Sequence, residues 1–120
     1  MILSHSFFRF LLVGFLGFFV DYTVFSLLYD DLGSTLARLI SILVAIFTTW
    51  IFNRRYTFSF KERNIIREFL KYLYFSKVSL IVNYIIFMLS VKLLGTSFIT
   101  GYILATGVSM FFNYNFYRTI

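Results

Sequence analysis

Long apolar runs alternate with short polar stretches along the chain, and this pattern predicts four helices. The runs cover residues 7–28, 36–52, 69–94 and 98–116. Each is about twenty residues long, the length of a helix that crosses the hydrocarbon core of a bilayer. None shows the strict alternation of a membrane β-strand. We therefore predict an all-α membrane protein with four transmembrane helices in a single domain, residues 1–120.

The polar connections predict how the helices are oriented. Glycine-containing turns follow the first and third runs, and residues 53–67 form the one long polar loop. Basic residues crowd on the side of that loop and of both termini: Arg9, Arg54, Arg55, Lys61, Arg63, Arg67, Lys71 and Arg118. The opposite side carries only Arg38 and Lys92. Cytoplasmic loops are the Lys- and Arg-rich ones, so we expect a multi-pass protein of the cytoplasmic (inner) membrane with both termini inside.

Composition agrees with a membrane protein and narrows the chemistry. Hydrophobic residues make up 60% of the chain and charged residues 13%, more apolar surface than a small soluble domain can bury. The chain has no cysteine and a single histidine, His5, which excludes thiolate and histidine metal sites. No nucleophile–base arrangement and no Gly-rich phosphate loop is present. We expect no metal, no cofactor and no enzymatic activity, and we attribute the net charge of +6 to topology rather than to nucleic-acid binding.

The second half of the chain repeats the first. Residues 62 apart match between the first and third runs: Gly14 with Ser76, Gly17 with Ser79, Asp21 with Asn83, Tyr22 with Tyr84, Phe25 with Phe87 and Gly33 with Gly95. Residues 60 apart match between the second and fourth: Ser41 with Gly101, Ala45 with Ala105, Thr49 with Ser109, Phe52 with Phe112 and Asn53 with Asn113. Both copies begin on the cytoplasmic side, so the pattern predicts two parallel helical hairpins. Their small residues share one face of each helix, where we expect close helix packing.

Several charged or amide side chains fall inside or at the edge of the apolar runs. Asp21 lies about 18 Å along its helix from Arg9, and a charged Asp at that depth costs about 2.5–3.5 kcal/mol. Several interpretations stay open. Asp21 either bonds between helices, for example with its repeat partner Asn83, or lies near the outer interface. Alternatively, Asp21 lines a polar path with Asn83 and Asn113, or it carries a coupling proton. Lys77 either snorkels to the headgroups or binds a lipid phosphate. For Arg38 we expect pairing with Asp30 or Asp31, or contact with outer headgroups.

The stretch WIFNRRYTF, residues 50–58, places two arginines inside an aromatic belt. Arginine forks match phosphate oxygens bidentately. Asn53, Arg54 and Arg55 are therefore candidates for binding a lipid phosphate, besides being ordinary topology markers. In the second copy Tyr114 and Asn115 replace the arginines, so we extend no phosphate role to them.

Together these segments resemble the GtrA-like family of small four-helix membrane proteins. The resemblance rests on RFLLVGFLGFFVDY at residues 9–22, WIFNRRYTF at 50–58, REFLKYLYFSKVSLIVNY at 67–84 and FFNYNF at 111–116. It implies translocation of sugars linked to a polyprenyl phosphate, such as undecaprenyl phosphate, for cell-surface polysaccharide synthesis. By this analogy Asp21, Asn53, Arg54 and Arg55 are the positions to mark.

Two alternatives stay open beside that function. A small proton-coupled exporter would use Asp21, although the strong charge bias argues against the dual topology common in such exporters. A non-transporting partner would anchor a glycosyltransferase and would not need lipid binding at Arg54 and Arg55. Because one small bundle offers little room for both a sugar and a lipid tail, we also expect a homo-oligomer.

Overall fold

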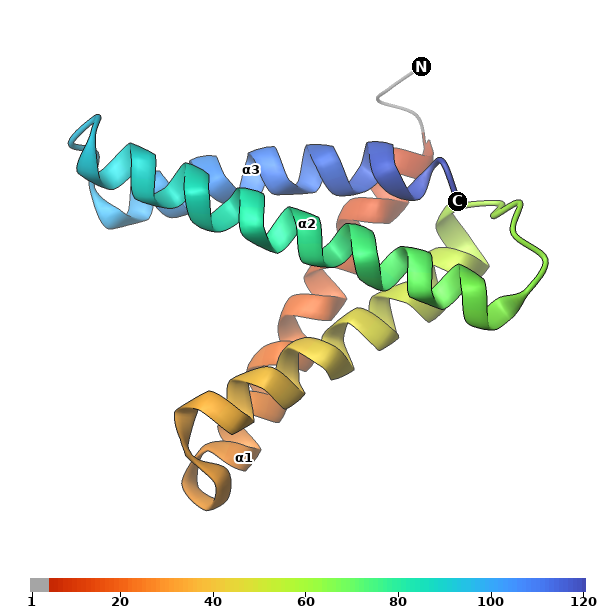
Figure 1. The fold of residues 1–120 in the computed structure, drawn as a ribbon, viewed down its shortest axis with the longest axis horizontal. Helices are drawn as coiled ribbons and strands as arrows, with labels where there is room; N and C mark the ends of the chain where they lie inside the picture. The colour runs from red at the N-terminus through yellow and green to blue at the C-terminus, as the bar shows by residue number, and fades with distance from the viewer. Residues whose placement is uncertain (1–4) are drawn as a thin grey trace. The chain divides into compact units, whose positions relative to one another are not determined.

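The structure is a computed structural model that describes residues 5–120 and is built almost entirely of helices. It contains α1 (His5–Phe52), α2 (Ile65–Lys92) and α3 (Phe98–Tyr117) (Figure 1). One turn of π-helix, η1 (Asn53–Thr57), continues α1. No strand occurs in the described part of the chain. The all-α prediction is confirmed, whereas the predicted count of four separate helices differs from the three that the structure contains.

The difference in helix count arises at Gly33, in the middle of α1. Its backbone is not helical, with φ 81° and ψ 170°, a combination that is essentially restricted to glycine. Helical backbone resumes directly after it, so α1 is a single long element that folds back on itself. We call residues 5–32 the first arm of α1 and residues 34–52 its second arm. Figure 1 shows both arms rising from this turn, which lies at the lower left of the picture.

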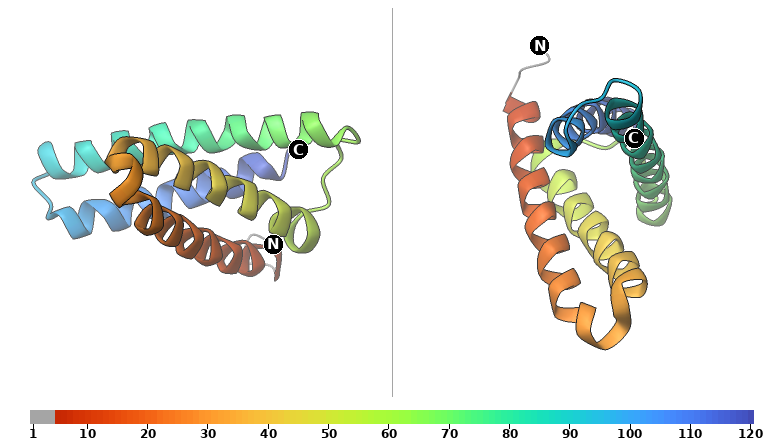
Figure 2. Two further views of the ribbon diagram at one scale, coloured as in Figure 1. Left: turned by 90° about the horizontal axis from the view of Figure 1, so that it is seen from below. Right: turned by 90° about the vertical axis from the view of Figure 1, so that its left-hand side faces the viewer.

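The chain divides into two compact units, and each unit is one hairpin. The first unit ends at Ser59 and contains α1 and η1, while the second, Phe60–Ile120, contains α2 and α3. α2 and α3 lie along each other in every view (Figure 2). The division falls between the two copies of the sequence repeat. The predicted loop 53–67 is shorter than expected, because η1 takes its first five residues and α2 begins at Ile65.

Corresponding repeat positions form the close contact within each hairpin. In the first unit, a Cβ added to Gly17 would overlap Cγ2 of Thr49. In the second unit, Ser109 Oγ donates to the carbonyl oxygen of Ser79 over 3.3 Å. Residues 79 and 109 are the repeat partners of residues 17 and 49. The small-residue faces therefore pack the arms of each hairpin together, as the sequence predicted.

Short polar side chains begin the two helices of the second unit. Asn64 caps α2 by accepting from the Arg67 amide over 3.1 Å. Ser97 caps α3 by accepting from the Thr100 amide over 3.2 Å. Such caps satisfy amides that have no partner inside the helix. The turn between these helices contains Gly95 at a positive φ of 68°.

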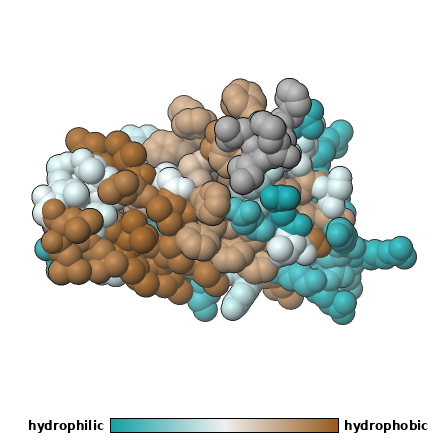
Figure 3. Space-filling model, turned by 90° about the horizontal axis from the view of Figure 1, so that it is seen from above, coloured by the Kyte–Doolittle hydropathy of each residue, from teal (hydrophilic) through white to brown (hydrophobic). Residues whose placement is uncertain are grey.

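The helix surfaces carry many large apolar side chains that are exposed in the described part of the chain. Phe19 is 66% exposed, Leu27 72% and Ile66 70%. Residues 6–57 and α2 are long and apolar enough to cross a membrane. In the second unit, hydrophobic residues dominate toward the α2–α3 turn and hydrophilic residues gather where α2 begins (Figure 3). This distribution suits helices whose solvent is lipid.

Candidate functional site

Three arginines gather where the two ends of the first hairpin meet. Arg9, at the start of the first arm, donates from Nη1 to the carbonyl oxygen of Tyr56 over 3.2 Å. Arg54 and Arg55 stand beside Tyr56 in η1, and the side chains of all three arginines are on the surface. We call Arg9, Arg54, Arg55 and Tyr56 the basic end of the first unit. Its cations are accessible to an anion at the edge of an apolar hairpin.

The local structure of the basic end follows from its aromatic residues and its π-turn. The Phe58 amide donates to the Asn53 carbonyl over 2.8 Å, which closes the turn five residues on. The Phe52 and Tyr56 rings stack at 6.0 Å, and the Arg55 guanidinium lies 5.6 Å from the centre of the Tyr56 ring. Cation–π contact of this kind orients an arginine without using its hydrogen-bond donors. Single π-turns often mark functional sites.

Asn53 differs from its two neighbours in accessibility. Its side chain is only 1% exposed, whereas Arg54 and Arg55 are both exposed. Of these three consecutive candidates for binding a lipid phosphate, only Arg54 and Arg55 therefore have side chains on the surface. Its repeat partner Asn113 is half-buried in α3.

The second unit repeats the aromatic part of this end without the arginine pair. Phe112 and Phe116 stack at 5.6 Å, as their repeat partners Phe52 and Tyr56 do. At the position of Arg54 stands Tyr114, which is 3% exposed and has the Arg118 guanidinium 5.4 Å from its ring centre. Nearby, the Tyr72 and Tyr117 rings stack at 3.9 Å. This end is packed with rings and offers no matching pair of exposed arginines.

Asp21 and Arg38 form an ion pair inside the first unit. Arg38 Nη1 lies 2.8 Å from both carboxylate oxygens of Asp21. The expectation that Arg38 pairs with Asp30 or Asp31 was therefore wrong. The carboxylate has a cation from its own hairpin, because the long arginine side chain reaches across from the second arm to the first. Asn83 itself is half-buried in α2 of the second unit.

Lys77 lies on the surface of α2, twelve residues after its first residue. That spacing puts it about 18 Å along the helix. No polar partner is recorded for it among residues 5–120. It belongs to the second unit.

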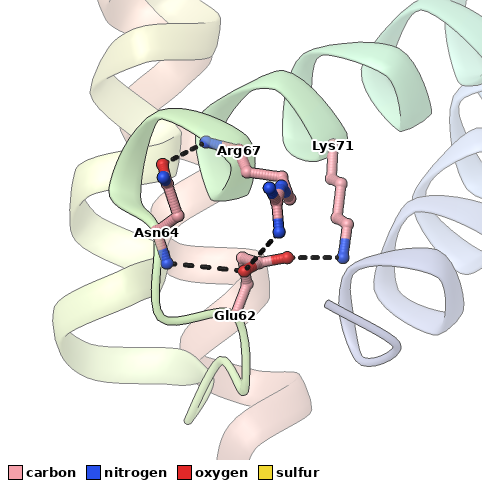
Figure 4. A network of polar contacts seen from close by, with 4 residues as sticks. All are labelled: Glu62, Asn64, Arg67 and Lys71. Atoms are coloured by element: carbon pink, nitrogen blue, oxygen red, sulfur yellow. Dashed lines mark hydrogen bonds and ion pairs between the residues drawn. The ribbon is translucent and has the colours of Figure 1, made fainter.

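A polar network that the sequence did not predict joins the loop to the start of α2 (Figure 4). Lys71 Nζ donates to Glu62 Oε1 over 2.8 Å. Arg67 Nη1 and the Asn64 amide approach Glu62 Oε2 at 3.8 and 3.4 Å. The hydrogen bond from Lys71, with smaller help from Asn64 and Arg67, holds the pKa of Glu62 below its usual value of 4.5.

Glu68 is a buried acid at the start of α2. It is only 1% exposed in the first turn of that helix. Its amide donates to the Asn64 carbonyl over 2.9 Å. The positive end of the helix dipole favours an acid in this turn, a local signal that indicates stabilisation but not burial.

One family model matches the chain. It describes the GtrA/DPMS transmembrane domain and covers residues 9–120. No curated protein and no solved structure matches the chain. The match spans both hairpins, including the basic end and the Asp21–Arg38 pair.

Proposed function

We infer that this chain, which belongs to the GtrA/DPMS transmembrane domain family, moves polyprenyl phosphate or a polyprenyl-phosphate-linked sugar across the cytoplasmic membrane. Membership makes it a membrane protein and implies involvement in polyprenyl-phosphate sugar handling. The finer function, movement between leaflets, is our proposal. So are the role in cell-surface polysaccharide synthesis and the absence of enzymatic activity.

The observation that carries the proposal is the pair of exposed arginines in η1. Arg54 and Arg55 stand directly after an apolar helix, beside Arg9 and the Phe52–Tyr56 stack. Guanidinium forks suit phosphate oxygens, and an aromatic and apolar surround suits the isoprenoid tail. A soluble anion needs no such apolar surround, so the setting favours a lipid phosphate.

The proposed topology places the basic end on the cytoplasmic side. In this topology α2, α3 and the two arms of α1 each cross the bilayer, and the Gly33 and Gly95 turns face outward. The charge bias between the two ends of the hairpins supports this orientation. We further propose that the protein works as a homo-oligomer, because exposed apolar surface is abundant on both units.

Native mass spectrometry of the purified protein with undecaprenyl phosphate and phosphatidylglycerol tests the proposal. We expect the wild type to prefer the polyprenyl phosphate, and Arg54→Ala/Arg55→Ala to lower its affinity about tenfold or more, because charge-assisted bonds to phosphate are lost. Lys61→Ala/Arg63→Ala removes two exposed loop cations and is the charge-matched control. Equal weak binding of both lipids, or equal losses in both variants, would contradict the proposal.

Lipid movement separates a transporter from an accessory protein. Reconstituted wild type should accelerate transfer of a labelled polyprenyl phosphate between the leaflets of liposomes. Binding without acceleration would replace our proposal with the role of a non-transporting partner of a glycosyltransferase. The exporter alternative gains no support from the fold, since the carboxylate of Asp21 is held by Arg38 and would have to leave that pair to carry a proton.

A further inference from the structure

We propose that Arg38, oriented by Asp21, is a second phosphate-binding position at the turn end of the first unit. This inference rests on the proposed function and extends it. The basic end would receive the lipid phosphate in one leaflet, and Arg38 would receive it in the other. The ligand is the phosphate group of a polyprenyl lipid.

The geometry of the ion pair leaves half of the arginine fork available. Both contacts with Asp21 are made by Nη1, and no partner is recorded for Nε or Nη2 within residues 5–120. The Arg38 side chain is 53% exposed, whereas that of Asp21 is 20% exposed. The carboxylate is thus less exposed than the guanidinium and holds it through Nη1, which leaves Nε and Nη2 for a ligand.

The spacing along α1 places this pair far from the basic end. Arg38 precedes Arg54 by sixteen positions, about 24 Å along the second arm. Asp21 lies about 18 Å along the first arm from Arg9. A bilayer core is about 30 Å thick. The pair therefore belongs to the leaflet opposite the basic end.

Comparison of the two hairpins shows that the second copy of the repeat closes without such a pair. The repeat partners of Asp21 and Arg38 are Asn83 and Phe98, which cannot form an ion pair. The second unit nevertheless closes as a hairpin, with Ser79 and Ser109 in contact. Charges inside a membrane are costly and usually functional. Retention of the pair in the unit that also carries Arg54 and Arg55 indicates a shared task.

The carboxylate also explains how a bound phosphate is released. A transport position must bind its ligand weakly enough to let it leave. Asp21 already neutralises much of the Arg38 charge, so a phosphate on Nε and Nη2 is held less tightly than by an unpaired arginine. Loss of the carboxylate should therefore strengthen phosphate binding, which is the opposite of what a purely structural ion pair predicts.

Titrations of undecaprenyl phosphate into the full chain in nanodiscs test this position. In the Arg54→Ala/Arg55→Ala background, the remaining binding should report on Arg38. We expect Asp21→Asn to tighten it about threefold or more, through the removed like charge. Arg38→Lys keeps the ion pair but loses the fork, so it should weaken binding about tenfold without a drop in thermal stability. Lys92→Gln removes another cation that the proposed topology puts on the outer side of the membrane, and it should leave the residual lipid affinity unchanged.

The outcomes separate the two proposals. If the unaltered chain does not prefer undecaprenyl phosphate over phosphatidylglycerol, the proposed function itself is overturned. If the chain binds this lipid through Arg54 and Arg55, while Asp21→Asn and Arg38→Lys leave the residual affinity unchanged, only the second position is overturned. Weaker binding in Asp21→Asn would also overturn it, since the carboxylate would then support the lipid rather than compete with it.

Discussion

Gly17 shows how a single missing side chain closes the first hairpin. The methyl group of Thr49 occupies the space that a Cβ at residue 17 would need. Thr49 cannot simply turn away, because its β-branched side chain is stiff and its Oγ1 donates to the Ile46 carbonyl over 3.1 Å. The second hairpin has Ser79 and Ser109 at the same two positions. There, Ser79 is larger than Gly17, and Ser109 on the other helix lacks the methyl group of Thr49.

This complementarity predicts a rescue. Gly17→Ala should lower the free energy of unfolding by about 1–3 kcal/mol, because the added Cβ overpacks the contact. Gly17→Ala/Thr49→Ser should recover at least half of that loss, since serine keeps the hydroxyl and removes only Cγ2. Thermal unfolding in detergent micelles measures both. A double variant no more stable than Gly17→Ala would show that the contact does not set the arm separation.

Residue-scale prediction from sequence succeeded where a property is local. The small residues at positions 17, 49, 79 and 109 were assigned correctly to helix contacts, because their spacing alone puts them on one face. The partner of Asp21 was not predictable in the same way. Arg38 is seventeen residues away, and which cation reaches the carboxylate depends on how the two arms are tilted and offset beyond Gly33. Helical spacing carries no information on that offset.

At the scale of elements, hydropathy located the helices well and their ends less well. The long apolar runs all became helix, since apolar runs of this length bury their backbone polar groups only in that way. The π-turn at Asn53–Thr57 was predicted to be loop, because a polar Asn-Arg-Arg sequence after an apolar run is typical of a loop. Helix α2 begins before its apolar run, because the Asn64 cap and the Glu62 contacts extend it into polar residues.

The Glu62 network predicts pH-dependent opening of the start of α2. A lowered pKa means that the network contributes its full stabilisation of the folded loop at pH values above the usual value of 4.5. This contribution is lost as the pH falls from there through the lowered pKa. Protection factors of the amides of residues 64–67, from hydrogen exchange, should fall in acid. Glu62→Gln should lower them already at pH 7.

Two further variants make the loop prediction specific. Lys71→Gln should reproduce the effect of Glu62→Gln, and the double variant should add little, because both changes break the same hydrogen bond. Lys61→Gln is the control, since only the backbone of Lys61 has a recorded contact, with the Ile120 carbonyl at 3.1 Å. Unchanged protection in Glu62→Gln would mean that the cap at Asn64 holds this end of α2 alone.

At the scale of the whole molecule, the internal repeat is the feature that sequence predicted most fully. The boundary between the two units falls between the repeats, and matched residues make matched contacts. The sequence could not show that the repeat partners Arg54 and Tyr114 differ in burial as well as in residue type. Asn53 and Glu68 are both buried, although both are polar residues at the end of a helix. Helical spacing does not determine which polar residues at a helix end are buried.

The proposed orientation can be tested on the whole chain, which contains no cysteine of its own. Ser34→Cys and Leu94→Cys, at exposed positions near the two turns, should react with an impermeant maleimide added outside intact cells. Ser59→Cys, exposed between the units, should react only after permeabilisation. The unaltered chain gives the background. Labelling of Ser59→Cys in intact cells, or of all three variants alike, contradicts a single orientation with both termini inside.

The Gly17–Thr49 and Ser79–Ser109 contacts also bear on how the nascent chain chooses its partners in the membrane. Four similar apolar segments of one chain can pair wrongly, a hazard of repeated architectures. An arm with Gly17 set against Ser109 would leave a void, and Ser79 set against Thr49 would put a side chain where the methyl group stands. Each half therefore fits its own sequence neighbour better than the other copy's. The small differences in side-chain size between the two repeats therefore favour pairing of each arm with its own neighbour in the sequence during assembly.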